Sequence, residues 1–159
     1  AEDYRTGSDG YEKNEEEAIR YYKLVAEDES AGDDILENAC FWIGWIMAKN
    51  DAEEDDAEAV LWFEKAIEKG NNGNGNNWLG WMYENGKGVP QDYEKAVELY
   101  KKAADTKSGY AQNRLGELYE NGYCGQVNLE EALKWYKLAA ENAYDGAQES
   151  VERVEKALQ

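Results

Sequence analysis

The chain has 159 residues, of which 42% are hydrophobic and 33% are charged, so it holds enough apolar side chains for one domain with a buried core. Its 35 acidic and 17 basic side chains give a formal net charge of −18, which disfavours direct binding to nucleic acid and to anionic membranes. Residues 1–60 hold 19 Asp or Glu against 5 Lys or Arg, a net charge of −14. A basic partner suits this excess, although most runs of charge are simply solvated.

The start of the chain leaves two questions open. The chain begins at Ala1 rather than at a methionine, and the sequence leaves its localisation open: cytoplasmic, or secreted or periplasmic if a leader was removed before Ala1. Tyr4–Gly7 resembles Tyr83–Gly86, which ends a helical pattern further along. The chain therefore either begins inside a longer array of repeats or has an atypical first unit, expected over residues 1–38.

Two helical patterns alternate along the rest of the chain. The first is marked every 36 residues by an apolar residue followed by glycine: Ile43-Gly44, Leu79-Gly80 and Leu115-Gly116. The second is marked by alanines 41, 37 and 36 residues apart: Ala18, Ala59, Ala96 and Ala132. The longer first interval indicates an insertion near Glu27–Asn38. Apolar residues recur in both patterns at the spacing of an amphipathic helix, so each unit is expected to be helix, turn, helix.

The turn residues support these helix ends. Gly86 and Gly122 follow the last apolar residue of a first helix, as a C-terminal glycine does. Asp92 and Asn128 lie just before a second helix, where a side-chain oxygen can accept hydrogen bonds from free N–H groups. The single proline, Pro90, lies in a turn, which favours long uninterrupted helices over a β fold.

The mid-helix glycines have a packing reason. Glycine inside a helix costs about 1 kcal/mol relative to alanine, so its repeated use predicts a close approach between helices. Aromatic residues recur on the second helices and are expected to fill the remaining space: Tyr22, Phe63, Tyr100 and Tyr136. A single helical hairpin cannot bury its apolar stripe, whereas stacked copies can.

The repeated phrase resembles the Sel-like repeat, a solenoid relative of the tetratricopeptide repeat. The matching residues are Leu79-Gly80, Tyr83, Gly86, Gly88-Val89, Asp92, Lys95-Ala96, Tyr100 and Ala103-Ala104. Departures include Met47, which replaces a tyrosine, and Cys124, which replaces the second turn glycine. The resemblance implies an all-α fold, a right-handed α/α superhelix of about four 36-residue units. One domain is expected over 1–159, with repeats at 39–74, 75–110 and 111–146 and a capping helix at 147–159.

The resemblance also implies that the first helix of each unit lines a concave groove. Transfer of the groove-facing positions gives a set of candidate partner-binding residues: Phe41, Trp45, Ala48, Lys49, Asn77, Trp81, Glu84, Asn85, Asn113, Glu117, Glu120, Asn121, Glu149 and Arg153. Trp45 and Trp81 are 36 residues apart, and so are Asn77 and Asn113, which suggests aromatic and amide ladders that grip an extended peptide. Packing between repeats remains an alternative for the tryptophans, and capping or solvation for the asparagines; Trp42 and Trp78 are expected to belong to the core.

Nothing in the sequence indicates catalysis, a cofactor or a metal. Histidine is absent, which removes the commonest general base and metal ligand. The acidic run Asp51–Asp56 lacks the glycine and terminal glutamate of a calcium loop. Gly70–Asn77 is expected to be a flexible loop rather than a phosphate cradle, because no P-loop lysine follows it. Cys40 and Cys124 form no recognised motif, and a disulfide between them lacks support.

Two functional hypotheses follow. The first is a non-enzymatic scaffold that binds a peptide or protein segment, basic in view of the charge, in its concave groove. The second is an acidic decoy that occupies the basic nucleic-acid-binding surface of another protein. Because residues 1–60 carry the charge, the decoy hypothesis predicts binding that collapses with salt.

Overall fold

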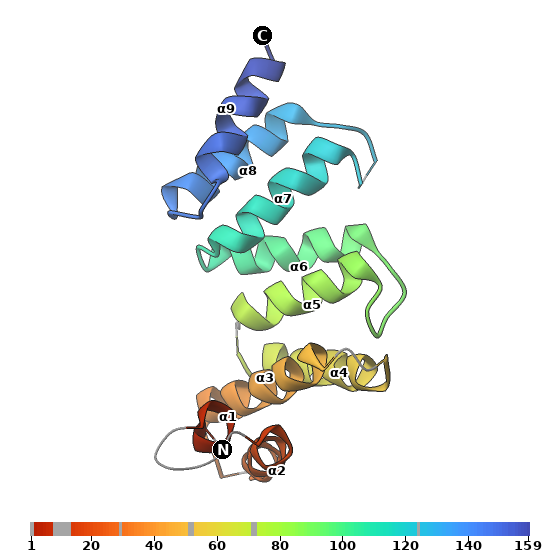
Figure 1. Cartoon of the computed structure of the whole chain (residues 1–159), viewed down its shortest axis with the longest axis vertical. Helices are drawn as coiled ribbons and strands as arrows, with labels where there is room; N and C mark the ends of the chain where they lie inside the picture. The colour runs from red at the N-terminus through yellow and green to blue at the C-terminus, as the bar shows by residue number, and fades with distance from the viewer. Residues whose placement is uncertain (1, 8–13, 29, 51–52, 71–72, 124) are drawn as a thin grey trace.

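The computed structural model describes residues 2–7, 14–28, 30–50, 53–70, 73–123 and 125–159, and these ranges contain helices and turns but no strand. The helices stack along the long axis of the molecule, from α1 and α2 at one end to α9 at the other (Figure 1). The all-α prediction is confirmed. The helices are α1 (Glu2–Thr6), α2 (Glu15–Ala26), α3 (Asp33–Lys49), α4 (Glu53–Lys69), α5 (Gly73–Asn85), α6 (Tyr93–Asp105), α7 (Gly109–Asn121), α8 (Leu129–Glu141) and α9 (Ala147–Ala157).

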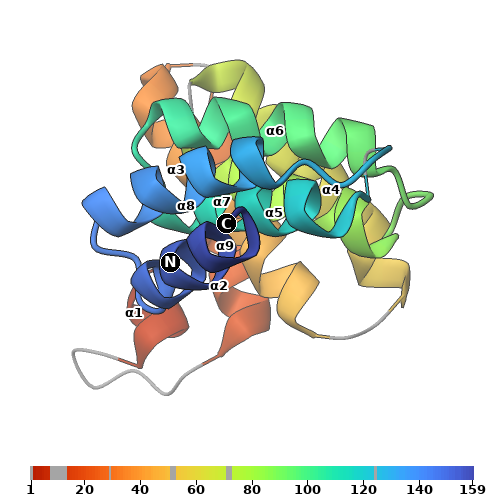
Figure 2. The same cartoon turned by 90° about the horizontal axis from the view of Figure 1, so that it is seen from above.

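Three hairpins, α3–α4, α5–α6 and α7–α8, form the body of the stack, and their first helices follow one another along it (Figures 1 and 2). The predicted end signals hold these hairpins in place. Asp92 and Asn128 accept hydrogen bonds from the N–H groups of Lys95 and Glu131, at 2.8 and 2.9 Å. Gly122 ends α7 in the left-handed region, at φ 69°, which a residue with a Cβ rarely adopts.

Each mid-helix glycine faces the aromatic ring of its own hairpin. A Cβ built on Gly44 would lie 3.0 Å from the Phe63 ring, and one on Gly80 would lie 3.0 Å from the Tyr100 ring. The same contact on Gly116 would be 2.6 Å, to Tyr136. All three rings are completely buried: Phe63, Tyr100 and Tyr136. The glycines therefore allow the two helices to approach closely enough for an aromatic ring to fill the space between them, as the sequence predicts.

Two local departures from expectation concern helix length. The insertion near Glu27–Asn38 is largely absorbed by α3, which has 17 residues against 13 in α5 and α7 and begins one turn earlier relative to its glycine. The expectation of a flexible loop over Gly70–Asn77 is wrong for its second half, because α5 begins at Gly73. Gly75 and Asn76 are buried, so packing outweighs the low helix propensity of this Gly/Asn run.

The end of the chain is an amphipathic helix. In α9, Ala147, Val151 and Val154 are buried against α8, whereas a polar face is exposed: Glu149, Glu152, Arg153, Glu155 and Lys156. Within the described ranges, no helix combines the length and hydropathy that crossing a membrane requires. Cys40 is a free, buried thiol, and Cys124 lies outside the described residues.

Candidate functional site

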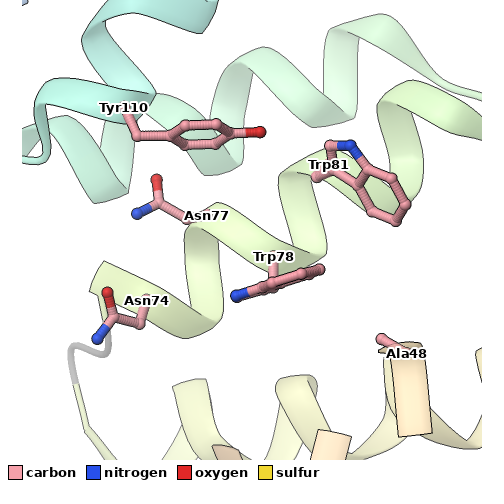
Figure 3. Close-up of a pocket in the computed structure, with 6 residues that line it drawn as sticks. All are labelled: Ala48, Asn74, Asn77, Trp78, Trp81 and Tyr110. Atoms are coloured by element: carbon pink, nitrogen blue, oxygen red, sulfur yellow. The ribbon is translucent and has the colours of Figure 1, made fainter. Parts of the chain in front are cut away.

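A pocket of about 460 Å³ opens beside α5, at the junction of three first helices. We call it the α5 pocket, and it is lined by Ala48 from α3, Asn74, Asn77, Trp78 and Trp81 from α5, and Tyr110 from α7 (Figure 3). The four α5 residues are spaced i, i+3, i+4 and i+7, so they form one stripe on one helical face. The pocket therefore lies between successive repeats and is lined by their first helices.

The aromatic walls of the pocket are fixed by packing. Trp78 stacks on Phe63 of α4, with ring centroids 6.2 Å apart and an interplanar angle of 10°. Trp81 meets Trp78 edge to face at 5.8 Å, and Tyr110 meets Tyr100 edge to face at 6.2 Å. Because neighbouring rings hold these side chains in place, they would lose little conformational entropy on binding a ligand.

The polar rim consists of two amides. The Asn77 side chain donates a hydrogen bond from Nδ2 to the Ser108 hydroxyl of the α6–α7 turn, at 2.9 Å. Ser108 also caps α7 by accepting from the Ala111 N–H at 3.2 Å, so Asn77 is tied to the start of the next repeat. Asn74 is exposed, and its amide makes no hydrogen bond with the described residues, which leaves its oxygen and nitrogen for a ligand.

The next junction, between α5 and α7, contains a group that we call the Glu84 triad: Glu84, Tyr100 and Arg114. A second pocket of about 320 Å³ opens there, and Glu84 and Arg114 line it together with mostly polar neighbours. The Tyr100 hydroxyl donates to Glu84 Oε2 at 2.7 Å, and the Arg114 guanidinium reaches back from α7 to pair with the same carboxylate. Partial burial disfavours the charge on Arg114, but hydrogen bonding to Glu84 and the charge of Glu117 raise the pKa of the guanidinium. The triad keeps its charges paired between α5 and α7.

At the α5 pocket the corresponding three residues are different. Ala48 is 36 residues before Glu84, Trp78 is 36 before Arg114, and Phe63 packs on Gly44 as Tyr100 packs on Gly80. The α5 pocket therefore lacks all three polar groups of the triad: the carboxylate, the guanidinium and the hydroxyl. Because alanine is much smaller than glutamate, the space that Glu84 occupies in one junction remains open in the other.

The remaining predicted residues of α3 lie outside the pocket lining. Phe41 is buried, with its ring 6.0 Å from Phe63, which leaves it little surface for a partner. Trp45 is half-buried against Trp42, and the Lys49 ammonium lies 5.3 Å from the Trp45 ring and 3.6 Å from a Glu15 oxygen. The predicted Trp45 and Trp81 stripe therefore has one member that already faces a cation of its own chain.

The predicted residues of α7 and α9 are largely engaged with other groups of the chain. Asn113 is buried and donates to Glu117 at 2.7 Å, so its amide is turned toward its own helix. Glu120 accepts a hydrogen bond from the Tyr136 hydroxyl at 2.7 Å and pairs with Arg153. Asn85 and Asn121 are exposed, and each donates to the carbonyl four residues earlier, at 2.8 Å.

The sequence interpretation missed three lining residues: Asn74, Trp78 and Tyr110. Trp78 was expected in the core, and it is half-buried, with one part packed on Phe63 and another facing the pocket. Asn74 and Tyr110 are 36 residues apart, each six positions before a mid-helix glycine. Extension of the groove pattern by one turn toward the N-terminus of each first helix would have found them.

Among the described residues, no group of three or more His, Cys, Asp or Glu side chains is arranged to hold a metal ion. Asp51 and Ala52, at the start of the acidic run that the sequence analysis considered for calcium, lie outside the described residues. The chemistry that the site offers is thus aromatic contact and amide hydrogen bonding.

The chain belongs to the Sel1 repeat family. The family model matches four successive stretches, residues 4–29, 38–71, 74–105 and 109–144. Proteins of this family are helical solenoids that typically act as scaffolds for protein–protein interaction and bind protein partners, and they are generally non-enzymatic. A search of curated protein sequences found no significant match.

Solved structures of the same type superpose well. The c5321 protein, a protective antigen of uropathogenic Escherichia coli with a Sel-like repeat fold, is 31% identical with a TM-score of 0.86, covering 99% of this chain. A Sel1 repeat protein from Oxalobacter formigenes is 27% identical with a TM-score of 0.79 over 95% of this chain, and cysteine rich protein B from Helicobacter pylori is 27% identical with a TM-score of 0.61 over 85%. This chain spans 32% of the E. coli chain, 59% of the Oxalobacter chain and 92% of the Helicobacter chain.

Proposed function

We propose that this protein is an interaction scaffold that binds an extended segment of a partner protein across α3, α5 and α7, with the α5 pocket as its central contact. The observation that carries the proposal is the pocket itself, which Asn77 and Trp81 line from successive turns of α5 (Figure 3). Large aromatic rings, tryptophan and tyrosine above all, are enriched among energetically dominant interface residues.

The charge of the chain supports a basic segment. The net charge of −18 attracts a cationic partner over a distance of about 10 Å at 0.1 M salt and raises the rate of encounter. Such steering acts outside the pocket, whose lining residues are all uncharged. We therefore assign charge to the approach of the segment, and aromatic and amide contacts to its retention.

Selection from a random peptide library displayed on phage, with the immobilised protein as bait, tests the proposal. Peptides recovered with the parent chain should bind the Asn77→Ala/Trp81→Ala variant on the order of tenfold more weakly or worse, since interface tryptophans are frequent hot spots. Trp62→Ala is the matched control, because Trp62 lies on α4 against Glu58 and Lys65, away from the pocket lining. Equal binding by the parent and the double variant, with circular dichroism unchanged, would contradict the proposal.

A decoy for a basic nucleic-acid-binding surface is the alternative that charge alone suggests. In the structure part of the acidic surface is already paired internally, since Lys23 lies 2.9 Å from Glu58 and Lys49 lies 3.6 Å from Glu15. The two proposed functions predict different responses to salt and to substitution when partner binding is measured. Decoy binding would disappear as salt is raised and would ignore the substitutions at Asn77 and Trp81, whereas scaffold binding would respond to the substitutions and persist in part.

A further inference from the structure

The tryptophans of this chain fall into two groups. Four of the six have a cation of the same chain near the ring: Arg5 at 3.8 Å from Trp42, Lys49 at 5.3 Å from Trp45, Lys65 at 4.2 Å from Trp62, and Lys134 at 5.3 Å from Trp135. Among the described residues, no cation lies over Trp78 or Trp81. The two exceptions are the two that line the α5 pocket.

We propose that the α5 pocket receives a cationic side chain, arginine or lysine, from the bound segment. This inference rests on the proposed function and adds which residue the segment must contribute. The electron-rich faces of Trp78 and Trp81 attract a guanidinium or ammonium group, and the attraction is stronger where the group is partly removed from water. The occupant thus supplies from outside the contact that the other four tryptophans find within the chain.

The lining suits a long side chain that carries its charge at the tip. Ala48 and Tyr110 offer apolar surface on opposite sides of the pocket, against which the methylene stem of arginine or lysine can pack (Figure 3). Asn74 lies on the same α5 stripe with its amide uncommitted, so its oxygen can accept a hydrogen bond from the charged group. The lining contains no lysine or arginine to oppose the occupant, and the chain as a whole is strongly acidic.

The adjoining junction shows how an ion pair could replace the aromatic lining of the pocket. There, Glu84 and Arg114 occupy the positions that Ala48 and Trp78 hold at the pocket. The substitutions Ala48→Glu and Trp78→Arg should recreate that ion pair between α3 and α5. This double variant removes an indole face and fills the space, while it borrows an arrangement that the same fold already contains.

A titration followed by the six tryptophan indole N–H signals in nuclear magnetic resonance spectra tests the inference. The probes are five peptides, acetyl-Gly-Ser-X-Ser-Gly-amide, in which X is arginine, citrulline, lysine, norleucine or leucine. Citrulline preserves the length of arginine without its charge, and norleucine keeps the four-carbon stem of lysine without its ammonium group. We expect the arginine and lysine peptides to shift two indole signals, which Trp78→Phe and Trp81→Phe identify, and to bind at least about threefold more tightly than their neutral counterparts.

The other outcomes overturn the inference. Equal or tighter binding of the citrulline, norleucine or leucine peptide would mean that the pocket takes an apolar side chain. The absence of shifts at Trp78 and Trp81 with millimolar arginine peptide would mean that it takes no cation. The Ala48→Glu/Trp78→Arg variant should lose the shifts while it stays folded, and if it unfolds, Ala48→Met fills the pocket without new charge and should weaken the arginine peptide in the same way.

Failure of this inference is distinguishable from failure of the proposed function. One outcome is that library-selected peptides lose binding to the Asn77→Ala/Trp81→Ala variant but still bind the parent chain when citrulline replaces their arginines. That result would support the scaffold proposal and contradict the inference that the pocket receives a cationic side chain. If the substitutions at Asn77 and Trp81 have no effect on the selected peptides, the scaffold proposal falls whatever the charge dependence.

Discussion

The α3–α5 and α5–α7 junctions are built on the same repeat but filled differently. The α5–α7 junction contains an ion pair and a tyrosine hydroxyl that satisfy each other, and the α3–α5 junction contains an alanine, an indole and a phenyl ring in their places. The comparison teaches that the character of a junction, charged or aromatic, depends on a group of side chains that change together. Three corresponding pairs carry the difference: Glu84 and Ala48, Tyr100 and Phe63, Arg114 and Trp78.

Removal of the carboxylate from the α5–α7 junction should have the largest effect. Glu84→Ala leaves the Tyr100 hydroxyl without its acceptor and Arg114 without its less exposed partner, since the Glu84 side chain is only 7% exposed. We expect a loss of about 2–3 kcal/mol in the free energy of unfolding, measured by urea denaturation. Glu84→Gln, which still accepts the hydroxyl hydrogen bond, is the control and should lose less; equal losses would show that the charge plays no part.

The contact distances at the mid-helix glycines should predict which glycine-to-alanine substitution destabilises the chain most. Gly116→Ala places a Cβ 2.6 Å from the ring of Tyr136, which is completely buried and hydrogen-bonded to Glu120. We expect overpacking to exceed the gain in helix propensity and to cost about 1–2 kcal/mol in thermal or urea unfolding. Gly44→Ala, where the contact with Phe63 is 3.0 Å, should cost less, and the reverse order would contradict the packing argument.

An added hydroxyl would test the correspondence between the junctions directly. Phe63→Tyr introduces a hydroxyl at a completely buried ring that faces no carboxylate, so it should destabilise the chain by about 1 kcal/mol. Addition of Ala48→Glu supplies the acceptor that Glu84 provides to Tyr100. A double-mutant cycle measured by urea unfolding should give a favourable coupling energy, and a coupling of zero would show that the two junctions are not equivalent.

The smallest effect near neutral pH concerns titration. Burial, with the nearby Tyr110 and Glu84, raises the pKa of Tyr100, and burial together with Glu2 raises the pKa of Tyr22 to about 12. Folding therefore favours the neutral phenols, so their stabilising contribution is complete below pH about 10 and declines as pH rises above it. The melting temperature should be flat from pH 7 to 9 and fall above 10, and Tyr100→Phe should make that fall shallower; an unchanged slope would contradict the assignment.

The helix pairs and their close packing could be predicted because both depend on the spacing of apolar, glycine and aromatic residues over short stretches of the sequence. The 36-residue interval placed the glycines opposite the aromatic rings, and the contacts of Gly44, Gly80 and Gly116 confirm it. The start of α5 was not predictable in this way. A run of glycine and asparagine has low helix propensity, and only the packing of Gly75 and Asn76 against other parts of the fold makes it helical.

The candidate site was predictable as a face of α5, but not as a pocket. The groove-facing positions that the family resemblance implies placed Asn77 and Trp81 on one face, and in the structure both line the same pocket. The same spacing could not show that Arg114 reaches back from the next repeat to Glu84, because that contact is 30 residues apart in sequence. The location of a pocket depends on such contacts between repeats, and the periodicity of a single helix gives no information about them.

The stack has a consequence for the cooperativity of unfolding. The main contacts of each helix are with its neighbours along the chain, apart from a smaller one between α3 and α5. Closure of such short-range contacts costs little entropy, so the chain should fold quickly, and its ends should open while its middle stays closed. A segment held across α3, α5 and α7 would join three units that otherwise depend on adjacent contacts, and binding would turn a chain of semi-independent hairpins into a single cooperative block.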